Sequence, residues 1–170
     1  MMHPRMKDRL SRLEAQRITR SHQPPAGMIP VLMFAIASRL GGYPQPQDLD
    51  PSRSVDGVCD GLARGLGYGG WAEMDQATQD ESGIEAWGAR METAFTELLR
   101  TEGIDRSQAD DVEVFGGLVR ILDEAGSREP GRSLLTGRPI TGWGDIDARL
   151  DEWIRASGLS PERVRAAARA

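Results

Sequence analysis

The sequence predicts an all-α fold, a compact bundle of about six helices with a partly detached basic helix at its N-terminus. Apolar residues recur at helical spacing along most of the 170-residue chain, and capping residues, Gly and Pro stand where these stripes begin and end. A chain of this length buries about 70% of the surface of its unfolded form, so it can hold a core without disulfides or metal. We therefore expect a basic helical arm over residues 1–22 and a single helical domain over residues 28–170.

The first predicted helix spans residues 4–21 and carries a narrow apolar stripe. Met6, Leu10 and Leu13 follow one another at spacings of four and three on an otherwise charged surface. This stripe is too short for a coiled coil. The helix is therefore expected either to dock on the body of the protein or to pair with a neighbouring subunit.

Charge divides the chain into a basic arm and an acidic body. Residues 1–20 contain six basic and two acidic residues, a net charge of +4, and because the whole chain carries −5, residues 21–170 carry −9. The basic residues of the arm are Arg5, Lys7, Arg9, Arg12, Arg17 and Arg20. A negative net charge argues against a protein whose whole surface binds nucleic acid, since that affinity comes mostly from Lys and Arg.

The next segment predicts a central, buried helix. Pro30 stands near its start and Gly41 just past its end, the usual punctuation of a helix. Apolar side chains between them cover nearly the whole circumference. A buried strand over residues 28–37 is the alternative, because the period of a short apolar run is ambiguous; we favour the helix.

A third helix follows Asp50 and Pro51 and places three glycines on one face. Gly57, Gly61 and Gly65 recur at steps of four. Each glycine inside a helix costs about 1 kcal/mol relative to alanine. Their alignment indicates that another backbone or a ligand comes close, and we favour close helix packing.

The glycines Gly65, Gly67 and Gly70 also match the dinucleotide pattern G-x-G-x-x-G. That pattern binds pyrophosphate where it follows a strand and opens a helix. In this chain it follows a helix, and there is no βαβ alternation. We therefore assign no dinucleotide, and the sequence indicates no other cofactor.

A short turn or helix with Trp71 and Met74 precedes the strongest helix of the chain. Asp80 or Ser82 is its N-cap, and Gly103 ends it. One continuous apolar stripe runs along this helix, formed by Ile84, Trp87, Met91, Phe95 and Leu98.

Ser107 and Asp110 open the following helix, in which Val112, Phe115, Leu118, Val119 and Leu122 are expected to face inward. The acidic residues Asp110, Asp111 and Glu113 suit the N-terminus of a helix. After Gly126 comes a long connection to Gly142. The chain closes with a helix over residues 145–157, carrying Ile146, Leu150, Trp153 and Ile154, and a short helix after Ser160 that carries Val164.

Residues that suit catalysis or metal binding are few. Cys59 is the only cysteine, and His3 and His22 fall in segments predicted to be exposed, so no rigid nucleophile and base pair is indicated. Asp56 and Asp60 lie four apart and are candidate acid/base groups or cation ligands. Ion pairs with arginines one turn away are the simpler account of both. We predict no metal site.

The longest apolar run has ten residues, Met28 to Ala37, whereas a membrane span needs about twenty. A lone cysteine is typical of a reducing compartment. We therefore expect a soluble, cytoplasmic protein without a membrane partner.

The arm cations and Arg128, Arg132 and Arg138 in the late connection are the candidate binding residues. We interpret the chain as a non-catalytic adaptor or assembly factor whose basic N-terminal helix binds a protein partner, with another copy of itself among the candidates. The alternative is a nucleic-acid-binding accessory factor that uses the same arm and the 128–138 segment on phosphates. A third hypothesis is an enzyme of unfamiliar type using Asp56 and Asp60. A short basic leading helix is also typical of small helical proteins of phages and other mobile elements.

Overall fold

The computed structural model describes residues 24–43, 54–126 and 143–170, without the side chains of residues 54–56, 126 and 143–145. These ranges contain helices and turns and no strand, so the predicted all-α class is confirmed. The elements are α2 (Met28–Ala35), the π-helix η1 (Ile36–Leu40), α3 (Ser54–Gly65), α4 (Trp71–Ala77), α5 (Glu81–Thr101), α6 (Asp111–Gly126), α7 (Trp143–Ala156) and α8 (Pro161–Arg169). In this part of the chain, no helix is long and apolar enough to cross a membrane.

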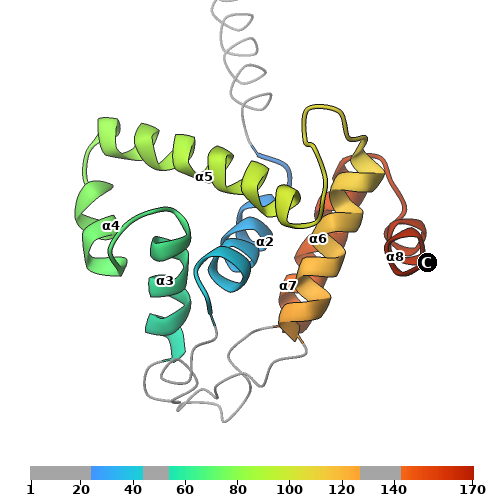
Figure 1. Cartoon of the computed structure of the whole chain (residues 1–170), viewed down its shortest axis with the longest axis horizontal. Coiled ribbons are helices and arrows are strands. Elements are labelled where there is room, and N and C mark those ends of the chain that lie inside the picture. Colours follow the sequence, from blue (N-terminus) through green and yellow to red (C-terminus); the bar gives the residue numbers. More distant parts are fainter. Residues whose placement is uncertain (1–23, 44–53, 127–142) are drawn as a thin grey trace, which may run out of the picture.

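Helix α2 lies at the centre of the fold, as its apolar circumference predicts. It contacts α3, α5, α6 and α7, which surround it in Figure 1. Its side chains Val31, Leu32 and Phe34 are buried. Residues 28–37 are therefore helical, and the strand alternative is wrong. The helix begins two residues before Pro30, after Gly27, which has a left-handed φ of 79°.

The last turn of this helical segment is a π-helix. The N–H of Gly41 donates to the carbonyl oxygen of Ile36 at 2.9 Å, a five-residue step. A Cβ at Gly41 would collide with the carbonyl oxygen of Gly61 on α3. The wide final turn is thus held directly against the backbone of α3.

Helix α5 runs along one side of the fold, and its apolar stripe extends past the core. Asp80 caps it by accepting the N–H of Gly83 at 2.7 Å. Met91 is buried and Trp87 is half-buried, whereas Ile84 is 55% exposed. The core therefore ends near Trp87, and the first turns of α5 carry the stripe into solvent.

Helices α6, α7 and α8 close the other side of the fold. Trp153 of α7 lies 5.0 Å from Phe115 and 6.0 Å from Phe95, measured between ring centroids, which joins α7 to α6 and α5. Val112 is 39% exposed, so the prediction that it faces inward is wrong. It belongs to the first turn of α6 and lies at the edge of the buried stripe.

Candidate functional site

The predicted binding cations lie outside the described residues. This holds for Arg5, Lys7, Arg9, Arg12 and Arg17 of the arm and for Arg128, Arg132 and Arg138. It also holds for the arm's apolar stripe and for both histidines. The described residues form the body of the protein, to which these segments are attached.

Close backbone packing occupies the glycine face of α3. A Cβ at Gly61 would lie 2.9 Å from the Cβ of Tyr43, and one at Gly65 would lie 2.6 Å from Cγ2 of Ile36. Gly57 is also buried. The π-helix η1 and the residues after it fill the space that the missing side chains leave, so no ligand is needed to explain Gly61 and Gly65.

Asp60 is engaged in the local structure. Its Oδ1 accepts the N–H of Trp71 at 2.9 Å, which caps the first turn of α4. The Nε of Arg64, one turn on, donates to the carbonyl oxygen of Gly41 at 3.1 Å. The side chain of Asp56 lies outside the described set. Among the described residues, no group of three metal-ligating side chains occurs.

Most arginines of the body are joined to carboxylates. Arg39 bonds Glu102 and Glu124, while Arg120 donates to the second oxygen of Glu102 at 2.9 Å. Arg106 pairs with Glu92 at 2.7 Å. The bonds of Arg39 and Arg120 tie η1, α5 and α6 together.

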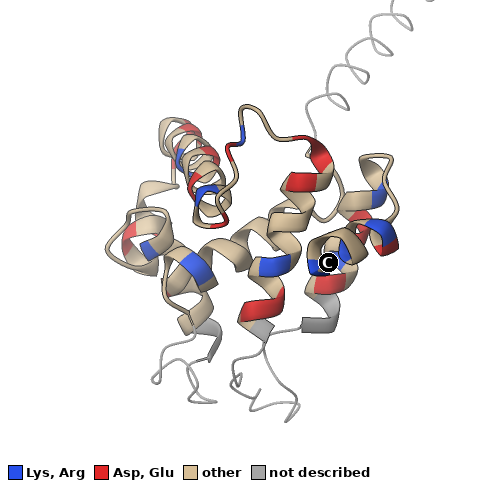
Figure 2. Ribbon diagram, turned by 45° about the vertical axis from the view of Figure 1, so that its right-hand side comes forward, with Lys and Arg blue, Asp and Glu red and all other residues tan. Residues whose placement is uncertain are grey.

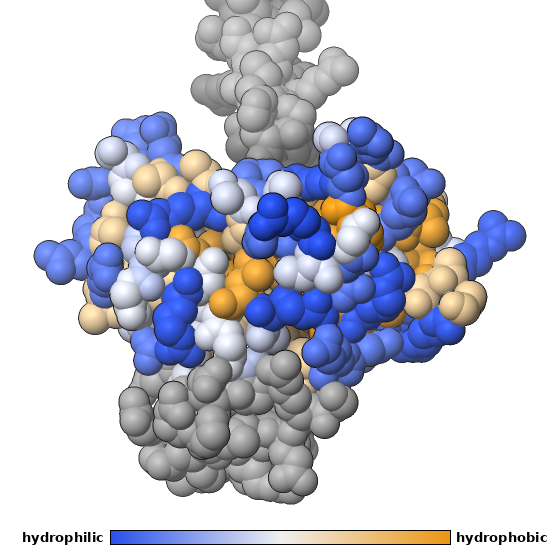
Figure 3. Space-filling view, in the orientation of Figure 1, coloured by the Kyte–Doolittle hydropathy of each residue, from blue (hydrophilic) through white to orange (hydrophobic). Residues whose placement is uncertain are grey.

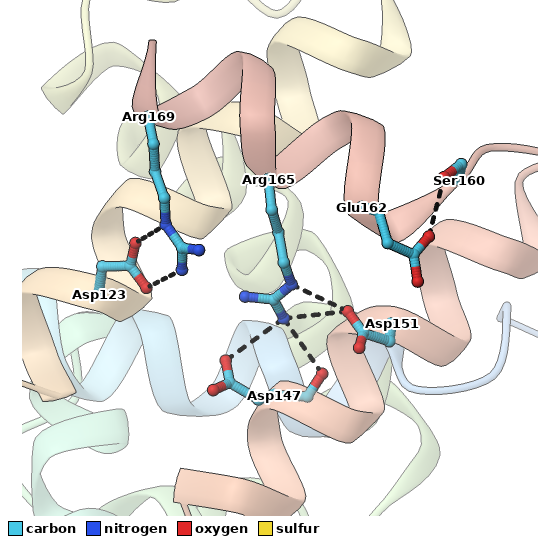
Figure 4. Close-up of polar contacts among 7 residues, drawn as sticks. All are labelled: Asp123, Asp147, Asp151, Ser160, Glu162, Arg165 and Arg169. Carbon is cyan, nitrogen blue, oxygen red and sulfur yellow. Dashed lines mark hydrogen bonds and ion pairs between the residues drawn. The ribbon is translucent and has the colours of Figure 1, made fainter.

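Two further arginines hold α8 in place (Figure 4). Arg165 lies between Asp147 and Asp151 of α7, and Arg169 donates from Nε and Nη2 to the two oxygens of Asp123 on α6. These hydrogen bonds and the charge of Asp123 raise the pKa of Arg169. Figure 2 shows the resulting alternation of basic and acidic residues on the C-terminal helices.

The acidic residues of α4 and the first turns of α5 have no such cations beside them in the sequence. We name residues 71–89 the α4–α5 corner; it lies at the left of Figure 1. It contains five acidic residues and no Lys or Arg. All five are exposed: Glu73, Asp75, Asp80, Glu81 and Glu85.

Three of these carboxylates have no partner in the described part of the chain. Glu73 accepts the N–H of Gly69, and Asp80 is the N-cap of α5. Asp75, Glu81 and Glu85 make no side-chain hydrogen bond or ion pair to a described residue. The α4–α5 corner is therefore a region of uncompensated negative charge.

The same corner exposes large apolar side chains. Ile84 is 55% exposed and Trp71 is 41% exposed, and together with Val112 they are the exposed large hydrophobics of the described residues. On the face seen in Figure 3, hydrophilic residues predominate and apolar residues form separate patches. The corner thus combines negative charge with the exposed N-terminal end of the apolar stripe on α5.

This corner was not among the predicted sites, although the sequence contains its signal. Five acids without a cation in nineteen residues is a local charge block, and the stripe of α5 begins with Ile84. Sequence periodicity predicts which residues share a face of α5. It cannot reveal that the other described elements leave Ile84 more than half exposed.

A groove of about 390 Å³ lies elsewhere in the described body, between the C-terminal end of α3 and the middle of α5. Leu40, Leu66 and Ala94 form its apolar floor. Arg90 stands at its edge, stacked 4.1 Å from the ring centroid of Tyr68 and donating to the carbonyl oxygen of Leu66. The groove has one cation and one carboxylate, Glu97, and no cluster of reactive groups.

Comparison with known proteins adds no functional information. No protein-family model, no curated protein sequence and no solved structure matches this chain.

Proposed function

We propose that this protein is a non-catalytic interaction protein, an adaptor or assembly factor, which binds an acidic protein surface through its basic N-terminal segment. The role fits a small cytoplasmic protein of the kind that phages and other mobile elements carry. Of the two carboxylates of the enzyme hypothesis, Asp60 caps α4, and the side chain of Asp56 lies outside the described residues.

One observation carries the proposal: the positive charge is separated from the body. Residues 1–20 carry +4 and the remainder of the chain −9. Arginines of the body, such as Arg39 and Arg165, are held in ion pairs by neighbouring carboxylates. An anionic partner would therefore find its cations on the N-terminal segment. Its Met6–Leu10–Leu13 stripe would supply apolar contact beside them.

Nucleic acid is the second candidate partner, because the same cations suit phosphates. Binding to the two kinds of partner depends differently on the salt concentration. Phosphate binding releases counterions and falls steeply with salt, whereas an interface with an apolar component persists.

Size-exclusion chromatography with light scattering tests the proposal. The full chain is run alone and with a duplex DNA at about 50 mM and about 200 mM salt. We expect a stable oligomer that is indifferent to DNA and that is lost in the variant Arg9→Glu/Arg12→Glu. A DNA complex that forms at low salt and dissociates at high salt would overturn the proposal in favour of the nucleic-acid function.

A further inference from the structure

We propose that the α4–α5 corner is the docking site for the basic N-terminal segment, residues 4–21, of a second copy of this chain. This inference rests on the proposed function, since it names the acidic surface that the segment binds. Two copies would exchange their N-terminal segments across a two-fold axis.

Charge complementarity is the first reason. The corner presents five exposed carboxylates without a cation, and Asp75, Glu81 and Glu85 have no partner among the described residues. The N-terminal segment carries the opposite charge, +4 over residues 1–20. Elsewhere in the body, carboxylates such as Glu92, Glu102 and Asp123 already pair with arginines of the same chain. At the corner, by contrast, added cations would meet carboxylates that have no ion pair with a described residue.

Matching apolar surface is the second reason. Ile84 and Trp71 are exposed on the two arms of the corner. Residues 4–21 carry an apolar stripe of three residues flanked by cations. An amphipathic helix lays such a stripe on an apolar surface and leaves its charges at the rim. The strip from the half-buried Trp87 to the exposed Ile84 on α5 suits a ligand of this shape.

The position of the chain favours a second copy over the same chain. The described residues begin beside α7, where Gly27 packs against the backbone of Arg149. In Figure 1, α7 lies on the opposite side of the fold from α4. When each copy places its N-terminal segment on the α4–α5 corner of the other, both segments and both corners are occupied. The assembly is therefore a closed dimer in which no segment or corner is left unoccupied.

Charge reversal on both partners tests the proposal in the full chain. Wild-type protein is expected to have about twice the 18.6 kDa chain mass by light scattering. The variant Asp75→Arg/Glu85→Arg should raise the dimer dissociation constant about tenfold or more, because it places cations opposite cations. Neither residue is a helix cap, so the body should stay folded, as far-UV circular dichroism will show.

A matched control separates a local effect from a change in net charge. Glu97→Lys/Glu152→Lys changes the net charge by the same amount. It removes only exposed pairs three residues apart, Arg100–Glu97 and Arg149–Glu152. Its dissociation constant should stay within about twofold of wild type. An equal loss of dimer in this control would overturn the proposed site.

Rescue gives the sharpest result. Arg9→Glu/Arg12→Glu should dissociate the dimer, and adding Asp75→Arg/Glu85→Arg to the same chain should restore it. Ile84→Ser should weaken the dimer without lowering the unfolding midpoint of the body, since the side chain is exposed.

The failures of the two proposals are distinguishable. A dimer that needs the arm cations but tolerates the corner variant would overturn this inference and leave the proposed function standing. A dimer unaffected by either variant would overturn both. A wild-type monomer at all concentrations would overturn the exchange between copies, and the test with DNA would then decide the function.

Discussion

The guanidinium of Arg39, on the π-helix, donates from Nη1 to Oε1 of Glu102, directly after α5, at 3.0 Å, and both side chains are more than four-fifths buried. Glu102 uses its other oxygen for Arg120 of α6, and Arg39 reaches Glu124 with its second nitrogen. One carboxylate therefore links three elements at the side of the core.

Replacing this carboxylate should destabilise the fold. Glu102→Gln removes the negative charge that two arginines share, although Arg39 keeps its ion pair with Glu124. We therefore expect a loss of about 2 kcal/mol in the free energy of unfolding, below the range for fully buried pairs. Urea denaturation at constant m-value measures it. Glu97→Gln, which breaks the exposed pair with Arg100, should cost less than about 0.5 kcal/mol. Equal losses in the two variants would contradict the role of the buried pair.

Two glycine-to-alanine substitutions should have opposite effects. Gly65→Ala would place a Cβ 2.6 Å from Cγ2 and 2.9 Å from the carbonyl oxygen of Ile36, so we expect a loss of about 2 kcal/mol. Gly88→Ala meets nothing within 4 Å on α5 and should gain about 0.5–1 kcal/mol from helix propensity. Thermal unfolding of both variants measures the difference. A rise in stability for Gly65→Ala would mean that α3 and η1 pack more loosely than these distances indicate.

Asp60 is expected to act as a cap and not as a cation ligand. Asp60→Ala removes the acceptor of the Trp71 N–H and should cost about 1 kcal/mol, whereas Asp60→Asn keeps an oxygen there and should cost less. Asp75→Ala, an exposed neighbour on α4, is the control and should stay within about 0.5 kcal/mol. Added Mg²⁺ should leave the melting temperature unchanged. A rise that disappears in Asp60→Asn would support the cation site instead.

Ser38 on the π-helix offers a test of a buried polar group. It is 4% exposed, and its hydroxyl has no hydrogen-bond partner among the described residues. Ser38→Ala removes the cost of burying that hydroxyl, so stability should be unchanged or rise by about 1 kcal/mol. Chemical denaturation measures the change. A loss of similar size would show that the hydroxyl is bonded, for example to a water in the cavity of about 10 Å³ lined by Arg39 and Ile121.

The pKa of Asp105 is lowered because the hydroxyl and then the N–H of Ser107 donate to its Oδ1, at 2.7 and 3.0 Å. A carboxylate whose folded pKa is lowered stabilises the fold above its ordinary pKa and loses that contribution as pH falls through the folded pKa. Ser107→Ala should therefore raise the pKa of Asp105, as NMR titration of the carboxyl carbon will measure. The stability difference between variant and wild type should shrink below about pH 4. An unchanged titration would contradict the assigned cause.

The sequence by itself determined the helical class, the caps and the buried faces. Asp80, one of the two predicted N-caps, caps α5, and α8 begins directly after Ser160, as predicted. Phe115, Leu118 and Leu122 are buried on one face of α6. These features follow from interactions within a few residues of the chain, so a periodic pattern contains them. The central position of α2 also followed from its apolar circumference.

Only the tertiary structure decided what each face meets. The π-helical turn exists where the backbone of α3 presses against Gly41, and Arg39 finds Glu102 more than sixty residues away. Val112 and Ile84 lie on apolar stripes and yet are exposed, because the other described elements do not cover them. Helical spacing fixes the direction of a side chain from its own axis. How far the neighbouring helices extend depends on contacts between distant parts of the chain, and these decide which charges and apolar residues are left for a partner.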